Sequence, residues 1–279
     1  MKKVLIVLLL CASVLSCNQK QKNDAADTET ATVSKKELAR KLCGDWLSEC
    51  YLSGVEKNKS ILSSDYDGQL LQLRMEENSL LSDSAAMTGG TEHEGGFYRR
   101  IKYDEGGNKY VSVDDKTEFL YEPSEWDAPF EISVNKDNLL ELYYPKTKNK
   151  ILYRRIESSC AVDDSEDFYI SNPMQVILRE ILFSGSYECD NKLVKFESNG
   201  SVSNFEDYHY YRVVSDFCEM PLCDIVIFFK TKDDMYMPVD GELYKYQLTS
   251  DGIQLQKINA NWEKYEFDID EKIIVLKKK

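Results

Sequence analysis

The 279-residue chain carries 49 acidic and 35 basic side chains, a formal net charge of −14. This balance argues against nucleic-acid binding, which depends on Lys and Arg neutralising phosphates, and against adhesion to anionic lipid through a basic patch. Two histidines argue against a His-rich metal site. The length fits one large domain or two small ones.

The first 17 residues have the pattern of an export signal. Two lysines precede the short apolar run Val4–Leu10, and small residues lead to Cys17. The run is shorter than the ~20 apolar residues of a transmembrane helix, so we expect residues 1–16 to be a cleaved signal peptide. Val14-Leu15-Ser16-Cys17 resembles a bacterial lipobox, which implies cleavage before Cys17 and acyl chains, such as palmitate, on that residue. The alternative is an ordinary signal peptide that leaves the Cys17 thiol free.

A polar tether is expected to connect this segment to the first folded element. Residues 17–33 contain almost nothing to bury and predict a solvated tether. Ser34 and Glu37 have the spacing of a capping box. A helix through Leu38–Cys43 should follow and end at Gly44.

The second half of the chain opens in the same way. Asn172-Pro173 predicts the start of a helix over Met174–Phe183, and Gly185 falls at its end. One residue beyond each glycine stands a large aromatic, in Gly44-Asp45-Trp46 and in Gly185-Ser186-Tyr187. Strand-like sequence with Glu and Cys is expected next in both halves, at Glu49-Cys50 and Glu188-Cys189. This repetition predicts an internal duplication, with chance similarity as the alternative.

Most of the remaining sequence predicts short strands. Alternation of apolar and polar residues marks 71–75, 130–134, 140–142, 194–196, 244–248 and 253–255, and a further strand is expected at 151–156. The turn Ser250-Asp251-Gly252 predicts that 244–248 and 253–255 form a β-hairpin. The continuous apolar runs Ile225–Phe229 and Ile273–Leu276 predict strands buried on both faces, and residues 83–96 predict a loop. Many short strands favour a β-sandwich or barrel over a βαβ fold. We expect two mainly β domains, 34–157 and 173–279, joined by the acidic linker 158–172.

The order of these elements is similar to a known family. A short helix, then Gly-x-Trp or Gly-x-Tyr at the head of the first strand, then an antiparallel meander resembles the lipocalin-like domain, which many exported lipoproteins of the Bacteroidetes carry. Tyr187 departs from the tryptophan that is usual there. The resemblance implies two tandem antiparallel barrels and a structural role for Gly44, Trp46, Gly185 and Tyr187. Such a barrel either holds one small ligand or is filled by its own side chains.

Six cysteines lie beyond Cys17, and in an exported chain an even number permits disulfides. Cys218 and Cys223 are the most plausible local pair, because Pro221 suggests a turn between them. Reduced, buried cysteine is the alternative. The spacing is not that of a zinc site.

Few residues suggest chemistry. His93 between two glutamates could bind a divalent metal, and Asp65–Gly68 and Asp163–Asp167 offer oxygen ligands for Ca²⁺; each is more simply a solvated loop, turn or linker. His209 suits packing or a surface position. A Cys–His nucleophilic pair has no local signature here, and no phosphate-binding, dinucleotide-binding or hydrolase motif occurs. We therefore expect no catalysis, no cofactor and no metal.

These expectations define a function class. The leading hypothesis is a non-catalytic, lipid-anchored envelope protein that binds a small apolar or amphipathic ligand or an envelope partner. The alternatives are an accessory lipoprotein whose filled barrels bind only proteins, and an envelope enzyme. The expected location is the bacterial outer membrane. Its periplasmic face is favoured because Asn18–Lys22 lacks the acidic run that directs some lipoproteins of the resembled group to the surface.

Overall fold

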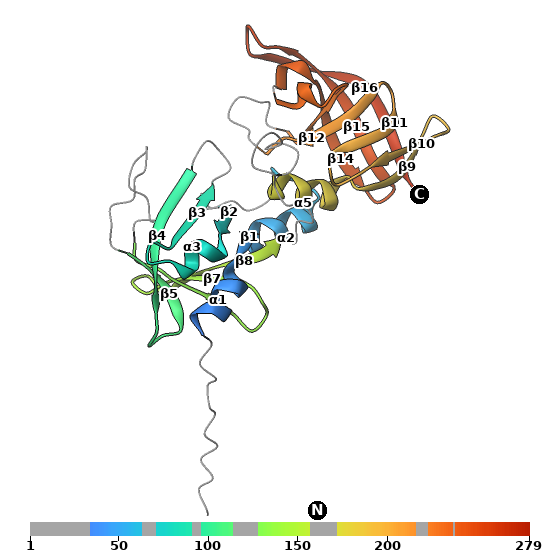
Figure 1. Ribbon diagram of the computed structural model, residues 1–279. Helices are drawn as coiled ribbons and strands as arrows, with labels where there is room; N and C mark the ends of the chain where they lie inside the picture. The colour runs from blue at the N-terminus through green and yellow to red at the C-terminus, as the bar shows by residue number, and fades with distance from the viewer. Residues whose placement is uncertain are drawn as a thin grey trace, which may run out of the picture. The chain divides into compact units, whose positions relative to one another are not determined.

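The computed structural model describes residues 34–62, 71–90, 96–113, 128–156, 172–215, 223–236 and 238–279. The chain from Val33 to Lys279 forms one compact unit. It contains two closed barrels in tandem, each of eight antiparallel strands and each preceded by a short helix (Figure 1). The predicted mainly β, lipocalin-like fold is thus confirmed.

The first barrel is an antiparallel meander in which each strand pairs with the next. Its strands are β1 (Gly44–Ser48), β2 (Gln72–Met75), β3 (Ala86–Gly90), β4 (Gly96–Asp104), β5 (Lys109–Ser112), β6 (Glu131–Val134), β7 (Leu140–Tyr144) and β8 (Asn149–Ile156). Pairing of β8 with β1, from Ile156 opposite Asp45 to Tyr153 opposite Ser48, closes the barrel. Closure leaves no free sheet edge at this seam.

The second barrel repeats this topology. Its strands are β9 (Gly185–Cys189), β10 (Lys192–Phe196), β11 (Ser201–Phe205), β12 (Tyr208–Val213), β13 (Ile225–Phe229), β14 (Glu242–Thr249), β15 (Gly252–Asn261) and β16 (Glu266–Lys278). The closing ladder between β16 and β9 is short and joins Lys277 to Glu188 and Lys278 to Tyr187. The predicted hairpin across Ser250–Gly252 is confirmed as β14–β15.

The helices are α1 (Lys35–Leu42), α2 (Glu49–Asn58), α3 (Glu77–Leu81) and α5 (Pro173–Leu182), with the 3₁₀ turns η2 (Asp233–Tyr236) and η3 (Pro238–Asp240). The predicted caps of α1 and α5 are confirmed. Ser34 Oγ accepts a hydrogen bond from the Glu37 N–H at 3.2 Å, and Asn172 Oδ1 accepts one from the Met174 N–H at 2.9 Å. Of the helices that the structure describes, none is long and apolar enough to cross a bilayer.

Two local expectations in the first half were wrong. Glu49-Cys50 begins α2 and does not continue the strand, because Ser48 caps the helix through a bond from the Tyr51 N–H to Ser48 Oγ. Tyr51, Leu52 and Val55 then form its buried face. The predicted loop 83–96 contains β3, which pairs with β2 and β4. In this strand the sheet ladder outweighs the weak strand propensity of glycine.

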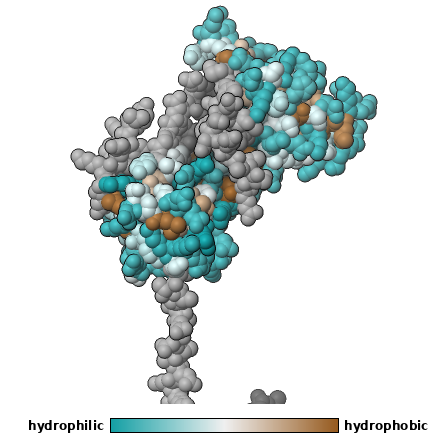
Figure 2. Space-filling view, viewed as in Figure 1, coloured by the Kyte–Doolittle hydropathy of each residue, from teal (hydrophilic) through white to brown (hydrophobic). Residues whose placement is uncertain are grey.

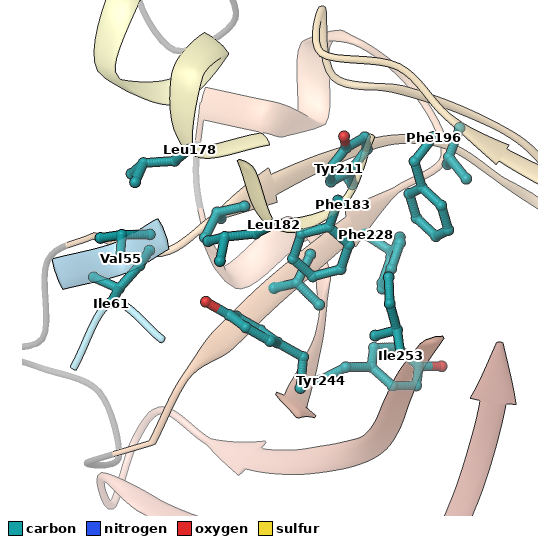
Figure 3. Close-up of a cluster of buried hydrophobic side chains, with 14 of the residues drawn as sticks. Val55, Ile61, Leu178, Leu182, Phe183, Phe196, Tyr211, Phe228, Tyr244 and Ile253 are labelled. Atoms are coloured by element: carbon teal, nitrogen blue, oxygen red, sulfur yellow. The ribbon is translucent and has the colours of Figure 1, made fainter. Parts of the chain in front are cut away.

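One apolar cluster joins elements of both halves. Val55 lies on α2 and Ile61 follows this helix. Both belong to the same buried cluster as Leu178 and Leu182 of α5 (Figure 3). A polar contact lies close to it, where Asp224 Oδ1 accepts hydrogen bonds from the backbone N–H groups of Ile61 (2.8 Å) and Leu62 (3.2 Å). The core of the second barrel therefore continues onto α2.

The two apolar runs of the second barrel behave differently. All of β13 is buried, as predicted: Val226 and Phe228 belong to the cluster of the barrel interior. The remaining residues of β13, which alternate with Val226 and Phe228, belong to a second buried cluster that includes Met235 of η2. Trp262 packs against this second cluster. The expectation for Ile273–Leu276 was wrong, because Ile273 and Val275 are 50 % and 46 % exposed. Residues 273–276 do lie in a strand, but only alternate residues face the core.

Candidate functional site

The glycine–aromatic pairs adopt the same arrangement in both barrels. Gly44 and Gly185 have φ values of +124° and +147°, which favour glycine. Trp46 Nε1 donates a hydrogen bond to the Leu42 carbonyl at 2.8 Å, and the Tyr187 hydroxyl donates one to the Phe183 carbonyl at 2.9 Å. Each acceptor lies four residues earlier, at the end of the preceding helix. Tyrosine thus makes the same contact in the second barrel that tryptophan makes in the first.

A basic residue of the last strand opposes each of these aromatic residues. Arg155 of β8 pairs with Trp46, and its guanidinium lies 5.9 Å from the centre of the indole ring. Lys278 of β16 pairs with Tyr187 at the equivalent place. Sequence reasoning missed both basic residues, because only closure of each barrel brings its first and last strands together. The shared geometry supports the predicted duplication and a structural role for the pairs.

Aromatic rings pack against one another in the interior of the second barrel. Phe183, Phe196, Tyr211 and Phe228 are at most 1 % exposed (Figure 3). Phe196 lies 5.1 Å from Tyr211 and 6.1 Å from Phe228, measured between ring centroids. Phe205 continues the stack, 4.8 Å from Phe228. Edge-to-face and tilted contacts at these distances are favourable packing geometries.

A polar cluster of Tyr208, Glu242, Tyr244 and Lys257 lies beside these rings, next to the turn from β11 to β12. The two tyrosine hydroxyls are 3.3 Å apart, and the Lys257 ammonium donates a hydrogen bond to the Glu242 carboxylate. Burial raises the pKa of Tyr208, and its hydrogen bonds with Tyr244 and Glu242 raise it further. Burial also acts to raise the pKa of Glu242, but Lys257 and Tyr208 outweigh it and hold the pKa below its usual value.

These shifts keep the tyrosines neutral and the glutamate charged at neutral pH. The polar cluster is therefore a hydrogen-bonded network in which the two charged side chains, both partly exposed, pair with each other.

The first barrel has a more aliphatic interior. Its buried cluster includes Leu73, Met87 and Leu142 together with Tyr110 and Tyr153. The Tyr110 hydroxyl donates a hydrogen bond to the Leu80 carbonyl of α3 at 2.8 Å, and burial raises the pKa of Tyr110 to about 12. The buried Tyr153 hydroxyl has no hydrogen-bond partner among the described residues. The two interiors thus differ in composition, although both are occupied by side chains of the protein itself.

Exposed apolar side chains occur on the outside of the second barrel. Ile273 and Val275 on β16 are two of them, and Leu193 on β10, which is 55 % exposed, is another. Figure 2 shows hydrophobic residues standing among hydrophilic ones on the visible face. Exposed apolar side chains that lie together on one surface are candidates for contact with another molecule.

The other candidate residues give no site. His209 lies exposed on β12. The described cysteines Cys43, Cys50, Cys189 and Cys223 form no disulfide with one another, and burial raises the pKa of Cys223. Within the described ranges, no group of His, Cys, Asp and Glu side chains could hold a metal ion. The remaining candidates, namely Cys17, Asp65–Gly68, His93, Asp163–Asp167 and Cys218, lie outside the described residues, so the Cys218–Cys223 disulfide stays a prediction.

Comparisons with protein-family models, with curated proteins and with solved structures found no match.

Proposed function

We propose that this protein is a non-catalytic, lipid-anchored bacterial envelope protein that acts by docking to a protein partner through the outer surface of its barrels. The filled interior of the second barrel carries this proposal. An eight-stranded barrel is just wide enough to be filled by its own side chains or to hold one small ligand. The aromatic stack from Phe183 to Phe228 favours the first of these uses.

The energetics of the interior support protein docking over ligand carriage. Removing a single packed Phe from a core costs about 3–5 kcal/mol. A ligand that entered the second barrel would have to displace several rings whose exposures are close to zero. The neighbouring hydroxyls of Tyr208 and Tyr244 contact each other, and Lys257 pairs with Glu242, within the polar cluster. Displacing these rings would therefore cost more packing energy than burial of a small apolar ligand could restore.

The anchor in this proposal is the acylated Cys17, followed by the tether 17–33. Two or more acyl chains give stable membrane attachment where one chain is marginal. The tether lets the folded unit reach a partner in or on the same membrane. We place the protein at the periplasmic face of the outer membrane, in keeping with the absence of an acidic run at Asn18–Lys22.

Chemical crosslinking in intact cells tests this function. The full-length chain and its Cys17→Ser variant are each treated with an amine-reactive crosslinker and then purified under denaturing conditions. We expect one discrete complex with a second protein for the native chain, and loss of that complex when the anchor is absent. Recovery of the native chain only in uncrosslinked form would contradict docking, and an undiminished complex with Cys17→Ser would contradict the role of the anchor.

A further inference from the structure

One strand of the second barrel uses only part of its hydrogen-bonding edge. β16 pairs with β15 from Glu266 onward, whereas on its other edge it pairs with β9 only at Lys277 and Lys278. Since β9 ends at Cys189, no strand in the described part of the chain pairs with this edge between Glu266 and Leu276. Backbone N–H and C=O groups along an unpaired edge are a template for an additional strand.

The edge has two different halves. Near the β15–β16 turn the edge carries four charged side chains, at Asp268 and at Asp270–Lys272. The pairing register between β15 and β16 also shifts there. Charges and bulges are the devices by which proteins protect a strand edge from pairing. The next four residues, Ile273–Leu276, carry no charge at all. The second half is thus open to pairing where the first half is protected.

The side chains around the open half are apolar. Ile273 and Val275 are half exposed, and Leu193 is the most exposed of the three. The register places Leu193 opposite Glu188, which in turn lies opposite Lys277, two residues beyond Val275. We call the edge Ile273–Leu276 together with Leu193 the β16 ledge.

The charges next to the β16 ledge indicate what would bind there. Lys272 and Lys277 flank it along the strand, and neither forms an ion pair with any residue that the structure describes. The nearby Lys279, by contrast, pairs with Glu188. Two lysines without carboxylate partners favour carboxylate groups in the part of the occupant that lies beside them. A second copy of this acidic chain is disfavoured by overall repulsion.

We infer that the β16 ledge is the docking site of the partner in the proposed function, and that the partner adds an extended segment to this edge. Main-chain hydrogen bonds to an added strand give affinity, and alternate side chains give specificity. The segment has apolar residues at alternate positions, which cover Ile273, Val275 and Leu193. It carries Asp or Glu close to Lys272 and Lys277. This inference rests on the proposed function.

Site-specific photo-crosslinking in intact cells tests the location. A photoreactive phenylalanine analogue replaces Ile273 in the full-length chain, and in a control it replaces Tyr98 on β4, whose exposure of 51 % matches the 50 % of Ile273. We expect crosslinks from position 273 to fall in a single partner segment with alternating apolar residues and nearby carboxylates. The control position should not reach that segment. A synthetic peptide of the segment should then bind the purified chain at least tenfold more weakly after Lys272→Glu plus Lys277→Glu, and equally well after Lys102→Glu on β4.

The outcomes separate the two proposals. Crosslinks to a partner from position 98 but not from position 273 would overturn the docking site and leave the proposed function standing. Crosslinks from neither position would overturn the docking site, and a missing complex in the amine-crosslinking experiment as well would overturn both. Crosslinks from position 273 to another copy of this chain, or to a segment without carboxylates, would overturn the partner chemistry stated here. Equal peptide affinities for the charge-reversed and control variants would do the same.

Discussion

Removal of two buried tyrosine hydroxyls, one in each barrel, should change the stability of the protein in opposite directions. The Tyr187 hydroxyl donates a hydrogen bond of 2.9 Å to the Phe183 carbonyl, and the residue is 4 % exposed. The Tyr153 hydroxyl is fully buried and has no described partner. Substituting Phe removes one oxygen atom in each case and keeps the ring. The sign of the stability change therefore depends on the hydrogen bond alone.

Tyr187→Phe should lower the free energy of unfolding by about 1–2 kcal/mol, because it leaves the Phe183 carbonyl without its partner in a buried place. With a urea m-value of about 1–3 kcal/mol/M, the unfolding midpoint should fall by roughly 0.3–2 M. Tyr153→Phe should leave the midpoint unchanged or raise it, since it removes a buried polar group that lacks a partner.

The assay is urea unfolding of the purified chain, followed by far-UV circular dichroism and by tryptophan fluorescence. Trp46 lies in the first barrel and Trp262 in the second, so the two barrels contribute separate fluorescence signals if they unfold separately. Tyr98→Phe, at an exposed position, is the control and should change nothing. Equal losses in Tyr187→Phe and Tyr153→Phe, or no loss in Tyr187→Phe, would refute the assigned role of the glycine–aromatic pair.

Three further predictions concern the backbone and the pH dependence of stability. Gly252→Ala should lower the free energy of unfolding by at least about 2 kcal/mol, because φ at Gly252 is +147° and an added Cβ would lie 1.9 Å from the Leu276 carbonyl oxygen. An unchanged urea midpoint would contradict this prediction. The pKa of Tyr110 is about 12 in the folded chain and near 10 in the unfolded chain. The contribution of the neutral hydroxyl to the free energy of unfolding is therefore present below about pH 10 and is lost as the pH rises through about 12. The difference in unfolding free energy between the native chain and Tyr110→Phe should therefore shrink by about 2 kcal/mol from pH 9 to 12, and a constant difference would count against this linkage. The Arg154 guanidinium holds the pKa of Glu49 below its usual value, so the contribution of Glu49 to the free energy of unfolding is present above pH 4.5 and is lost at lower pH. Glu49→Gln should lower the free energy of unfolding by about 1–2 kcal/mol at pH 7 and by clearly less at pH 3. An equal loss at both pH values would argue against the ion pair.

Features set by local sequence could be predicted. The capped start of α1, the Asn172-Pro173 start of α5 and the hairpin β14–β15 each depend on a few neighbouring residues. Side-chain caps, a proline at the first helical turn and a Gly-containing turn act over one to four positions. These elements were therefore predicted correctly without knowledge of the rest of the fold.

Features set by distant contacts could not be predicted. The match of Glu49-Cys50 to Glu188-Cys189 predicts a strand, whereas Glu49-Cys50 begins α2, whose Val55 packs in one buried cluster with Leu178 and Leu182 of α5. The pairings of Arg155 with Trp46 and of Lys278 with Tyr187 arise only when each barrel closes.

The candidate site depended on strand register in the same way. The aromatic content of residues 208–211 and of Phe228-Phe229 suited a filled interior as well as a pocket. Which side chains face inward follows from the pairing of β12 with β13 and of β13 with β14. The exposure of Ile273 and Val275 likewise follows from the early end of β9 and from the pairing of β16 with β15. A continuous apolar run carries no information of this kind.

Native mass spectrometry of the full-length chain, purified in mild detergent from the cells that make it, tests the central claim most directly. A filled barrel predicts the mass of the chain with any acyl groups covalently attached to it, alone or with a protein partner, and no additional small molecule. A small mass that accompanies the chain and is lost on denaturation would contradict the filled interior and restore ligand binding as the function.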